Sequence, residues 1–247
     1  MDLGISGRVA AVAAGSSGLG LGSARALAAE GCRVVVCGRD EARLERAVAE
    51  LGSVGPGTVT GVRADVSTAE GAAGFVAAAE ADAGAPIDIL VANAGGPPPG
   101  DFTSTDVGAY AAALELNLVS TVAMCKSAVP GMQARGWGRV VAITSLSVRQ
   151  PMPNLILSNT ARAGATAFLK TLALEVAADG VTVNSVQPGL HDTPRLDALY
   201  TTEQRAEMRM GDADDFGSVV AFLCGEQAKF TTGVQLHVDG GAYAALL

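Results

Sequence analysis

A glycine-rich turn near the start of the chain has the composition of an anion-binding loop. A short apolar run from Val9 is followed by an Ala- and Leu-rich helical pattern, and the turn between them holds four glycines within eight residues: Gly15, Gly18, Gly20 and Gly22. A strand, a glycine turn and a helix N-terminus together expose backbone N–H groups, and they suit a pyrophosphate. Ser23 stands where the last small residue of G-x-G-x-x-G is expected, so an ordinary tight strand-to-helix turn is the alternative interpretation.

Three other side chains could carry chemistry. Ser158 and Arg162 are four positions apart in a helical pattern from 155 to 178, so they share one face of a helix. Arg162 stays protonated, and it could bind ribose hydroxyls or hold an anionic substrate by a two-pronged contact. His191 lies in a predicted loop, where it could titrate near neutral pH and act as an acid, or simply face solvent.

The elements that must position these residues alternate along the chain. Six further apolar runs are predicted to be strands, at 33–37, 58–63, 87–92, 139–143, 181–187 and 235–238. Helical patterns lie between them, and Ser67, with Glu70 three residues on, is predicted to cap the helix after the third strand. This alternation predicts βαβ units and a parallel sheet covered on both faces, with ligands at the carboxyl ends of the strands.

Composition argues against several classes of function. The chain has 247 residues, the size of one α/β domain, and its formal net charge of −8 argues against nucleic acid and anionic membranes as partners. No uninterrupted apolar run reaches the ~18 residues of a membrane span, and the N-terminus lacks the basic start of a signal peptide. The four cysteines show no C-x-x-C spacing, so we expect free thiols in a reducing cytoplasm and no metal site.

Several short motifs follow one another along the chain: Ala13 to Gly20 on T-G-x-x-x-G-x-G, Asp65-Val66, Ala92 to Gly95 on N-N-A-G, Asn117, Ser145, Pro188-Gly189 with Thr193, and Val238 to Gly241. In these motifs and in their order, the sequence from about residue 5 to residue 241 resembles the short-chain dehydrogenase/reductase family, especially its 3-oxoacyl-acyl-carrier-protein reductases. The resemblance implies an α/β fold with a Rossmann-type doubly wound seven-stranded parallel sheet, in a single domain spanning residues 1–247.

The resemblance also implies a nicotinamide cofactor and the residues that bind it. Among them, the pair at 65 and 66 would contact the adenine, and Thr193 would hold the nicotinamide amide. The implied cofactor site comprises Gly15, Ser16, Ser17, Gly18, Leu19, Gly20, Asp65, Val66, Asn93, Ala94, Gly95, Arg162, Pro188, Gly189 and Thr193. Ala14 stands where the family has glycine, and we expect alanine to be tolerated there only with a negative φ.

The end of the second predicted strand favours NADP(H) over NAD(H). In this kind of fold an acidic residue at that position binds the ribose 2′-hydroxyl, whereas a nearby arginine serves a 2′-phosphate. Here the strand ends in Gly38-Arg39 with no carboxylate at the end itself, although Asp40 follows. Arg39 is therefore a candidate for the 2′-phosphate, the alternative being that it merely faces solvent.

The sequence departs from the family at the centre of the chemistry. The family pattern is a serine, then a tyrosine thirteen positions later, then a lysine four positions after that, and counting from Ser145 gives Ser158 and Arg162. In the family the tyrosine protonates the carbonyl oxygen while hydride arrives. A serine hydroxyl is much less acidic than a phenol of pKa ~10, and it is shorter by a whole ring. A substrate oxygen would have to move, or a water would have to fill the gap.

Three functions are compatible with this pattern. The first is an NADP(H)-dependent reductase of a small carbonyl compound (a 3-oxoacyl thioester, a quinone or a diketone), with the proton delivered by Ser145, Ser158, His191 or water and with Asn117 supporting a water chain. The second is a nucleotide-binding pseudoenzyme or regulatory subunit. The third is a non-redox reaction on an anionic substrate.

Two further expectations concern the substrate side and assembly. Gln150, Pro151 and His191 are expected to line the substrate pocket, with plain loop positions as the alternative. The charged stretch 195–209 is either a mobile lid or a solvated helix. By resemblance the chain is expected to form a homo-oligomer, a tetramer or at least a dimer, through the apolar helices at 104–135 and 155–178.

Overall fold

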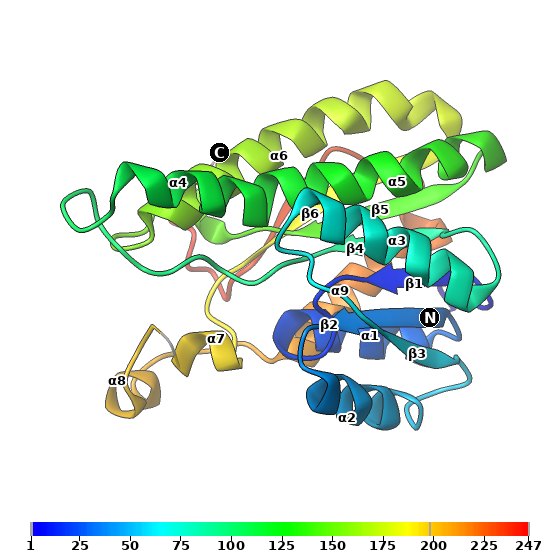
Figure 1. Cartoon of the computed structure of the whole chain (residues 1–247), viewed down its shortest axis with the longest axis horizontal. Helices are drawn as coiled ribbons and strands as arrows, with labels where there is room; N and C mark the ends of the chain where they lie inside the picture. Colours follow the sequence, from blue (N-terminus) through cyan, green and yellow to red (C-terminus); the bar gives the residue numbers. More distant parts are fainter. Residues whose placement is uncertain (1, 198, 247) are drawn as a thin grey trace.

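The seven predicted strands form one parallel sheet in a computed structural model that describes residues 2–197 and 199–246 (Figure 1). The strands run in the order β3-β2-β1-β4-β5-β6-β7, so the chain reverses its direction of winding between β1 and β4. Their bounds are β1 Val9–Val12, β2 Arg33–Gly38, β3 Val59–Arg63, β4 Ile89–Ala92, β5 Gly138–Ile143, β6 Val181–Pro188 and β7 Gln235–Val238. The doubly wound fold predicted from the alternating pattern is confirmed.

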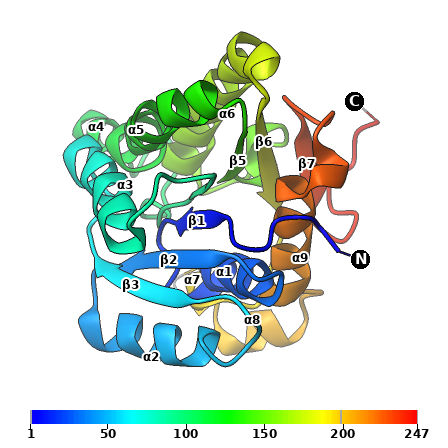
Figure 2. The ribbon, with the colours of Figure 1, turned by 90° about the vertical axis from the view of Figure 1, so that its right-hand side faces the viewer.

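Helices cover both faces of the sheet, and Figure 2 shows the two layers. On one face lie α3 (Ala69–Ala83), α4 (Val107–Leu114), α5 (Ser120–Arg135) and α6 (Ile156–Val176); on the other lie α1 (Gly18–Ala29), α2 (Glu41–Leu51) and α9 (Ala213–Cys224). Successive strand residues enter opposite cores, as with Ala11 beneath α3 and α5 and Val12 beneath α1 and α9. Burial on both sides explains why the central strands β1, β2 and β4 read as nearly continuous apolar runs.

Several predicted boundaries differ from the structure. The cap of α3 is Thr68 rather than Ser67, because the Thr68 side chain accepts the hydrogen bond from the Gly71 N–H. The helical region expected at 104–135 begins at Val107 and is interrupted by a π-helical turn. The charged stretch after Thr193 holds two short helices, α7 (Pro194–Asp197) and α8 (Thr202–Ala206), rather than one helix.

The continuous helical segment Val107–Arg135 qualifies the expectation about membranes. By length and composition alone it could cross a bilayer, with a mean hydropathy of 1.4 and 28% of its most apolar window buried. In the fold its second half packs against α3 and the sheet and carries the buried residues Met124, Cys125 and Met132. One such helix is weak support for a membrane span, and its core packing gives it a role within the domain.

Candidate active site

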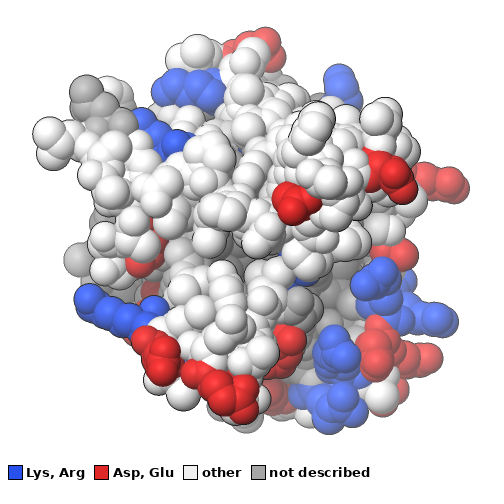
Figure 3. Space-filling model, turned by 90° about the vertical axis from the view of Figure 1, so that its left-hand side faces the viewer, with Lys and Arg blue, Asp and Glu red and all other residues white. Residues whose placement is uncertain are grey.

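A pocket of about 430 Å³ opens at the carboxyl ends of the strands, where the sheet order reverses between β1 and β4. The glycine turn after β1 and the ends of β4, β5 and β6 form its floor, while α7 and the residues around Tyr200 close one side. Figure 3 views this side of the molecule, and the surface around its central hollow is largely uncharged, with charged side chains of both signs lying mainly toward the edges of the view. The pocket lies where ligands bind in open α/β sheets.

The glycine turn meets a segment 175 positions further along the chain. Gly18 has a φ of +55°, and a Cβ built on it would lie 3.4 Å from the Thr193 side chain. A Cβ on Gly20 would lie 2.9 Å from the Asn93 side-chain nitrogen and overlap the Ala14 carbonyl oxygen. These two glycines therefore let the turn approach Thr193 and Asn93, both of which line the pocket.

The expectation for Ala14 is wrong. Its φ is +47°, in the left-handed region that alanine normally avoids. Its N–H points to the Cys37 sulfur at 3.4 Å, and the N–H of the next residue, Gly15, donates to the Cys37 carbonyl at 3.0 Å. These contacts with the end of β2 hold the turn in a conformation that costs free energy at this position, and Ala14 lies at the pocket wall.

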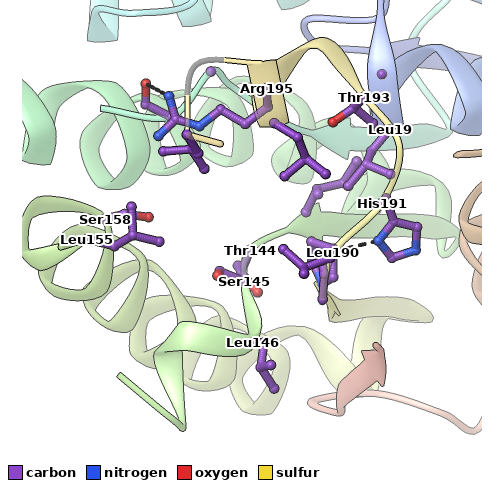
Figure 4. A pocket seen from close by; sticks show the side chains of 18 of the residues that line it. Leu19, Thr144, Ser145, Leu146, Leu155, Ser158, Leu190, His191, Thr193 and Arg195 are labelled. Atoms are coloured by element: carbon purple, nitrogen blue, oxygen red, sulfur yellow. Dashed lines mark hydrogen bonds between the residues drawn. The ribbon is translucent and has the colours of Figure 1, made fainter. Parts of the chain in front are cut away.

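Ser145 is held at the end of β5 with its hydroxyl available to the pocket. Its Oγ accepts a hydrogen bond from the Ser147 N–H at 3.1 Å and caps the short helix Leu146–Val148. The accepted bond fixes the position of the oxygen and leaves the hydroxyl proton free to be donated. Ser145 and Ser158 enter the pocket from different elements, as Figure 4 shows.

Asn117 lies in a π-helical turn, Glu115–Val119, between α4 and α5. Its Nδ2 donates to the Gly95 carbonyl at the end of β4 at 2.8 Å. Its Oδ1 is buried and has no hydrogen-bond partner among the described residues. Single π-turns are frequent at functional sites, and a buried acceptor without a partner fits an added donor such as water. The residue contacts a pocket-lining glycine without itself lining the pocket.

Ser158 and Arg162 lie one turn apart on α6 and both line the pocket, as their spacing predicts. Ser158 is only 7% exposed. The Arg162 guanidinium donates from Nη1 to the carbonyls of Ile143 and Thr144 at 3.0 Å each, and from Nη2 to Gly95 at 3.4 Å. Burial lowers the pKa of Arg162 to about 10, with a further contribution from the positive charge of Arg195.

Arg195 also lines the pocket, although the sequence pattern marks it only as one charge in the stretch 195–209. It is the second residue of α7, and its guanidinium donates to the carbonyls of Pro97 at 2.7 Å and Gly96 at 3.4 Å. Burial lowers its pKa. Tyr200, the one tyrosine among the described residues that line the pocket, was also given no role. Both come from the segment between β6 and α9, whose path a linear pattern does not fix.

His191 is buried rather than exposed in a loop, with 5% of its surface accessible. Its ring packs edge-on against Phe216 at a centroid distance of 5.2 Å, and its Nδ1 lies 3.3 Å from the Gly189 carbonyl. Burial lowers its pKa, against smaller opposing effects from the Gly189 carbonyl and nearby aspartates. In Figure 4 the ring points away from Ser145, although the residue borders the pocket.

The loop after Ser145 lines the pocket with residues other than Pro151. Gln150, Met152 and Leu155 line it, whereas Pro151 is exposed and outside the lining, which corrects the expectation for that residue. The Gln150 Oε1 accepts from the Ala244 N–H at 3.1 Å, and Ala242 also lines the pocket, so the C-terminal tail forms part of the rim.

The adenine end expected for a dinucleotide lies outside this pocket. A Cβ on Gly38 would lie 2.6 Å from the Ser16 hydroxyl, so the end of β2 lets the glycine turn approach closely. Arg39 is 74% exposed by side chain and lies 4.0 Å from Asp65, whose pKa is lowered mainly by hydrogen bonds from Ser67 and less by Arg39. Val66 is buried in the core.

The residues present fit a nicotinamide dinucleotide. The glycine turn bends toward the pocket at Gly18, with its positive φ, and lies close to the end of β2 at Ser16 and Gly38, while the unpartnered Asn117 Oδ1 adds a hydrogen-bond acceptor behind Gly95. Of the residues predicted for the cofactor, ten line the pocket: Ser17, Gly18, Leu19, Asn93, Ala94, Gly95, Arg162, Pro188, Gly189 and Thr193. Gly15, Ser16, Gly20, Arg39, Asp65 and Val66 lie outside it. Among the described residues no cluster of His, Cys, Asp or Glu could hold a metal ion.

Comparison with known proteins identifies the family. The profile described as Enoyl-(Acyl carrier protein) reductase matches residues 13–243. Dehydrogenase/reductase SDR family member 4 of Sus scrofa is 35% identical over 248 residues, covering 97% of this chain and 88% of that protein. Nodulation protein G of Azospirillum brasilense is 34% identical, covering 96% of this chain and 98% of that protein.

Several solved structures share the fold of this protein over nearly its whole length. L-Sorbose reductase of Gluconobacter frateurii, complexed with NADPH and L-sorbose, has a TM-score of 0.92 at 31% identity and covers 100% of both chains. A variant of actinorhodin polyketide ketoreductase with NADPH has a TM-score of 0.90 at 31% identity, covering 97% of this chain and 98% of that one. A 7α-hydroxysteroid dehydrogenase with NADH has a TM-score of 0.91 at 26% identity, covering 100% and 98%. The chain described here belongs to the short-chain dehydrogenase/reductase family of oxidoreductases.

Proposed function

We propose that the protein is an NADP(H)-dependent reductase of a carbonyl compound in which the proton is delivered without the family's tyrosine. One observation supports this proposal most directly. Four residues that the family resemblance assigns to the site line a single pocket beside the glycine turn: Asn93, Ser145, Arg162 and Thr193. The solved relatives bound to NADPH support the choice of cofactor.

Bound NADPH would supply the hydride, and residues of this chain would position the substrate and the cofactor. Ser145 donates a hydrogen bond to the substrate oxygen from a hydroxyl fixed by the Ser147 N–H. Thr193 holds the nicotinamide end from the segment after β6. Arg162, held by the carbonyls at the end of β5, positions the ribose of the nicotinamide half. Arg39 serves the 2′-phosphate at the far end.

Ser158 and Arg162 occupy the places of the family's tyrosine and lysine in this proposal. Ser158 is buried at the pocket wall and its side chain is small, so a water held by its hydroxyl fills the space of the missing ring. Asn117 supports the water chain with its unpartnered Oδ1. A positioned general acid contributes ~10²–10⁴ in rate, so turnover on ordinary ketones is slow and an activated carbonyl is the better substrate.

NADPH oxidation with a panel of 3-oxoacyl thioesters, quinones and diketones tests this function. Ser145→Ala should abolish turnover, while Ser158→Tyr combined with Arg162→Lys should preserve or raise it. His191→Ala and Tyr200→Phe test the two rival donors, and a large loss confined to either variant would transfer the acid role from water to that side chain. Tight cofactor binding with no turnover on any carbonyl would instead favour the pseudoenzyme.

A homo-oligomer is part of the same proposal. Val107 at the start of α4 is 88% exposed, and Leu174 near the end of α6 is 72% exposed, although both helices are strongly apolar. Large exposed apolar patches mark interaction sites, and we place these two side chains in the subunit interface. Light scattering at micromolar concentration should give a dimer or tetramer, and Leu174→Glu should shift it toward monomer; a wild-type monomer would contradict this expectation.

A further inference from the structure

Arg195 is held over the pocket by the backbone at the end of β4. Its two hydrogen bonds to carbonyls of Gly96 and Pro97 join α7 to a segment about a hundred positions earlier in the chain. Its side chain extends across the top of the pocket toward the side on which Ser158 and Leu155 lie, as Figure 4 shows. The guanidinium is therefore a fixed wall of the substrate region rather than a solvated surface charge.

The Arg195 guanidinium occupies the space that a side chain at position 96 would fill. A Cβ built on Gly96 would lie 2.7 Å from both Cζ and Nη2 of Arg195 and 2.9 Å from its Nε. Gly96 has no left-handed φ, so backbone conformation does not explain the glycine. The close approach of Arg195 does, since any side chain at position 96 would displace the guanidinium.

The charged side chains that line the described part of the pocket are all positive. Arg162 and Arg195 both line it, and no aspartate or glutamate does so among the described residues. Neither arginine forms an ion pair with a described carboxylate; each is held by neutral backbone carbonyls. Burial lowers the pKa of Arg162, and the positive charge of Arg195 lowers it further. Partly buried, unpaired guanidinium groups are costly unless a ligand supplies the negative charge.

We infer that the substrate is a carbonyl compound carrying a carboxylate, which Arg195 binds while Ser145 holds the carbonyl oxygen. Two of the five N–H groups of Arg195 donate to the carbonyls of Gly96 and Pro97, and the remaining three can donate to a carboxylate, which a lysine held in the same place cannot reproduce. The remaining wall is apolar, with Met152, Leu155, Leu190, Leu196 and Leu199, so the acid carries a hydrocarbon chain. This inference rests on the proposed function and specifies its substrate class.

The reduction needs only NADPH and one proton from solvent. Hydride from NADPH forms the new C–H bond at the carbonyl carbon, and the π bond of the carbonyl breaks. A proton from the water held near Ser158 forms the O–H bond, and a proton from solvent, passed along the water chain, converts the remaining hydroxide back to water. The oxo acid is reduced to a hydroxy acid and NADPH is oxidised to NADP⁺, while the carboxylate on Arg195 is unchanged.

Matched acids and esters test the inference. We would measure kcat/KM for 2-, 3- and 4-oxohexanoate and for their methyl esters, which differ only in charge and its position relative to the carbonyl. Arg195→Gln should lower kcat/KM for the best acid by ~10–100-fold and change that of its ester by less than about 3-fold. Arg195→Lys should give an intermediate loss, because the charge remains and the fork does not. Arg209→Gln, in the same stretch but outside the pocket lining, is the matched control and should change neither.

Gly96→Ala tests the same contact without altering the charge. It should reproduce the acid-selective loss of Arg195→Gln, because the new methyl group displaces the guanidinium. Equal losses for acid and ester in both variants, or weaker NADPH binding in Arg195→Gln, would overturn the inference and assign Arg195 to the cofactor. Thermal unfolding of each variant verifies folding, and Arg195→Lys remains available if Arg195→Gln does not fold.

A binding measurement separates this inference from the proposed function. Hexanoate and methyl hexanoate have no carbonyl to reduce, and each would be titrated calorimetrically into the complex with NADP⁺. Hexanoate should bind the wild type and should lose at least about tenfold in affinity with Arg195→Gln, whereas the ester should show no such difference. If no compound is reduced but this pattern is observed, the reductase function is wrong and the carboxylate site stands. If hexanoate shows no binding that depends on Arg195, the carboxylate site is wrong whatever the activity.

Discussion

Gly217 on α9 lies directly against the backbone of Gly22 on α1. A Cβ on Gly217 would overlap the carbonyl oxygen of Gly22, and a Cβ on Gly22 would overlap the carbonyl of Ala213. The fourth glycine of the turn therefore brings two helices together on one face of the sheet, and it has no contact role in the pocket. This packing fixes α1, whose N-terminus begins at the cofactor turn.

Gly217→Ala should destabilise the protein by roughly 1–3 kcal/mol, because the added methyl group forces the two helices apart. Urea unfolding would measure the loss. Gly74→Ala is the matched control: Gly74 is an exposed interior residue of α3 with nothing within 4 Å of the place that an added methyl group would take, so this change should stabilise by about 0.5–1 kcal/mol. Equal effects of the two substitutions would contradict the close packing.

Ala14→Gly should stabilise the protein by about 0.5–1 kcal/mol. The substitution relieves a left-handed conformation that costs ~1–2 kcal/mol for alanine, and the greater freedom of glycine in the unfolded chain returns part of that gain. Ala77→Gly, at an exposed position inside α3, should instead destabilise by ~1 kcal/mol. A loss of stability in Ala14→Gly would show that the turn does not hold this conformation in solution.

Arg39→Ala should weaken NADPH binding by ~10–100-fold and leave NADH binding nearly unchanged. The exposed guanidinium at the end of β2 is free to make a charge-assisted contact with a 2′-phosphate, worth ~1.5–3 kcal/mol. Fluorescence titration of both cofactors would measure the difference. Arg46→Ala removes the same charge from an exposed position on α2 and should affect neither. Tighter binding of NADH than NADPH by the wild type would refute the predicted preference.

Burial of His191 predicts a pH dependence of stability. Its pKa in the folded protein is lowered from 6.5, so between that lowered value and 6.5 the unfolded chain binds a proton that the folded chain does not. The free energy of unfolding therefore rises with pH through this window. The contribution of the neutral, buried His191 is progressively lost as the pH falls below 6.5. His191→Asn should be less stable than the wild type at pH 8, by a margin that shrinks at pH 5.5. A margin independent of pH would contradict this origin.

Much of the fold is determined locally. The run at 33–37 predicts a buried parallel strand because it is short, nearly all apolar and followed by Gly38, and the run at 181–187 predicts another because it is rich in valine and followed by Pro188. Ser158 and Arg162 share a face of α6 because their spacing of four residues places them there on any helix. The ends of helices are not determined locally: Thr68 rather than Ser67 caps α3, because only the backbone geometry decides which hydroxyl meets the Gly71 N–H.

The sequence by itself determined the alternation of strands and helices, the glycine turn and the absence of a tyrosine thirteen positions after Ser145, since each is a matter of residue type and spacing. Tertiary structure alone decided that Ala14 takes a positive φ, that His191 packs on Phe216 and that Arg195 rests on Gly96. Those facts depend on contacts between segments up to about a hundred positions apart. The free energy of such contacts is set by packing and burial in three dimensions, which no local pattern encodes.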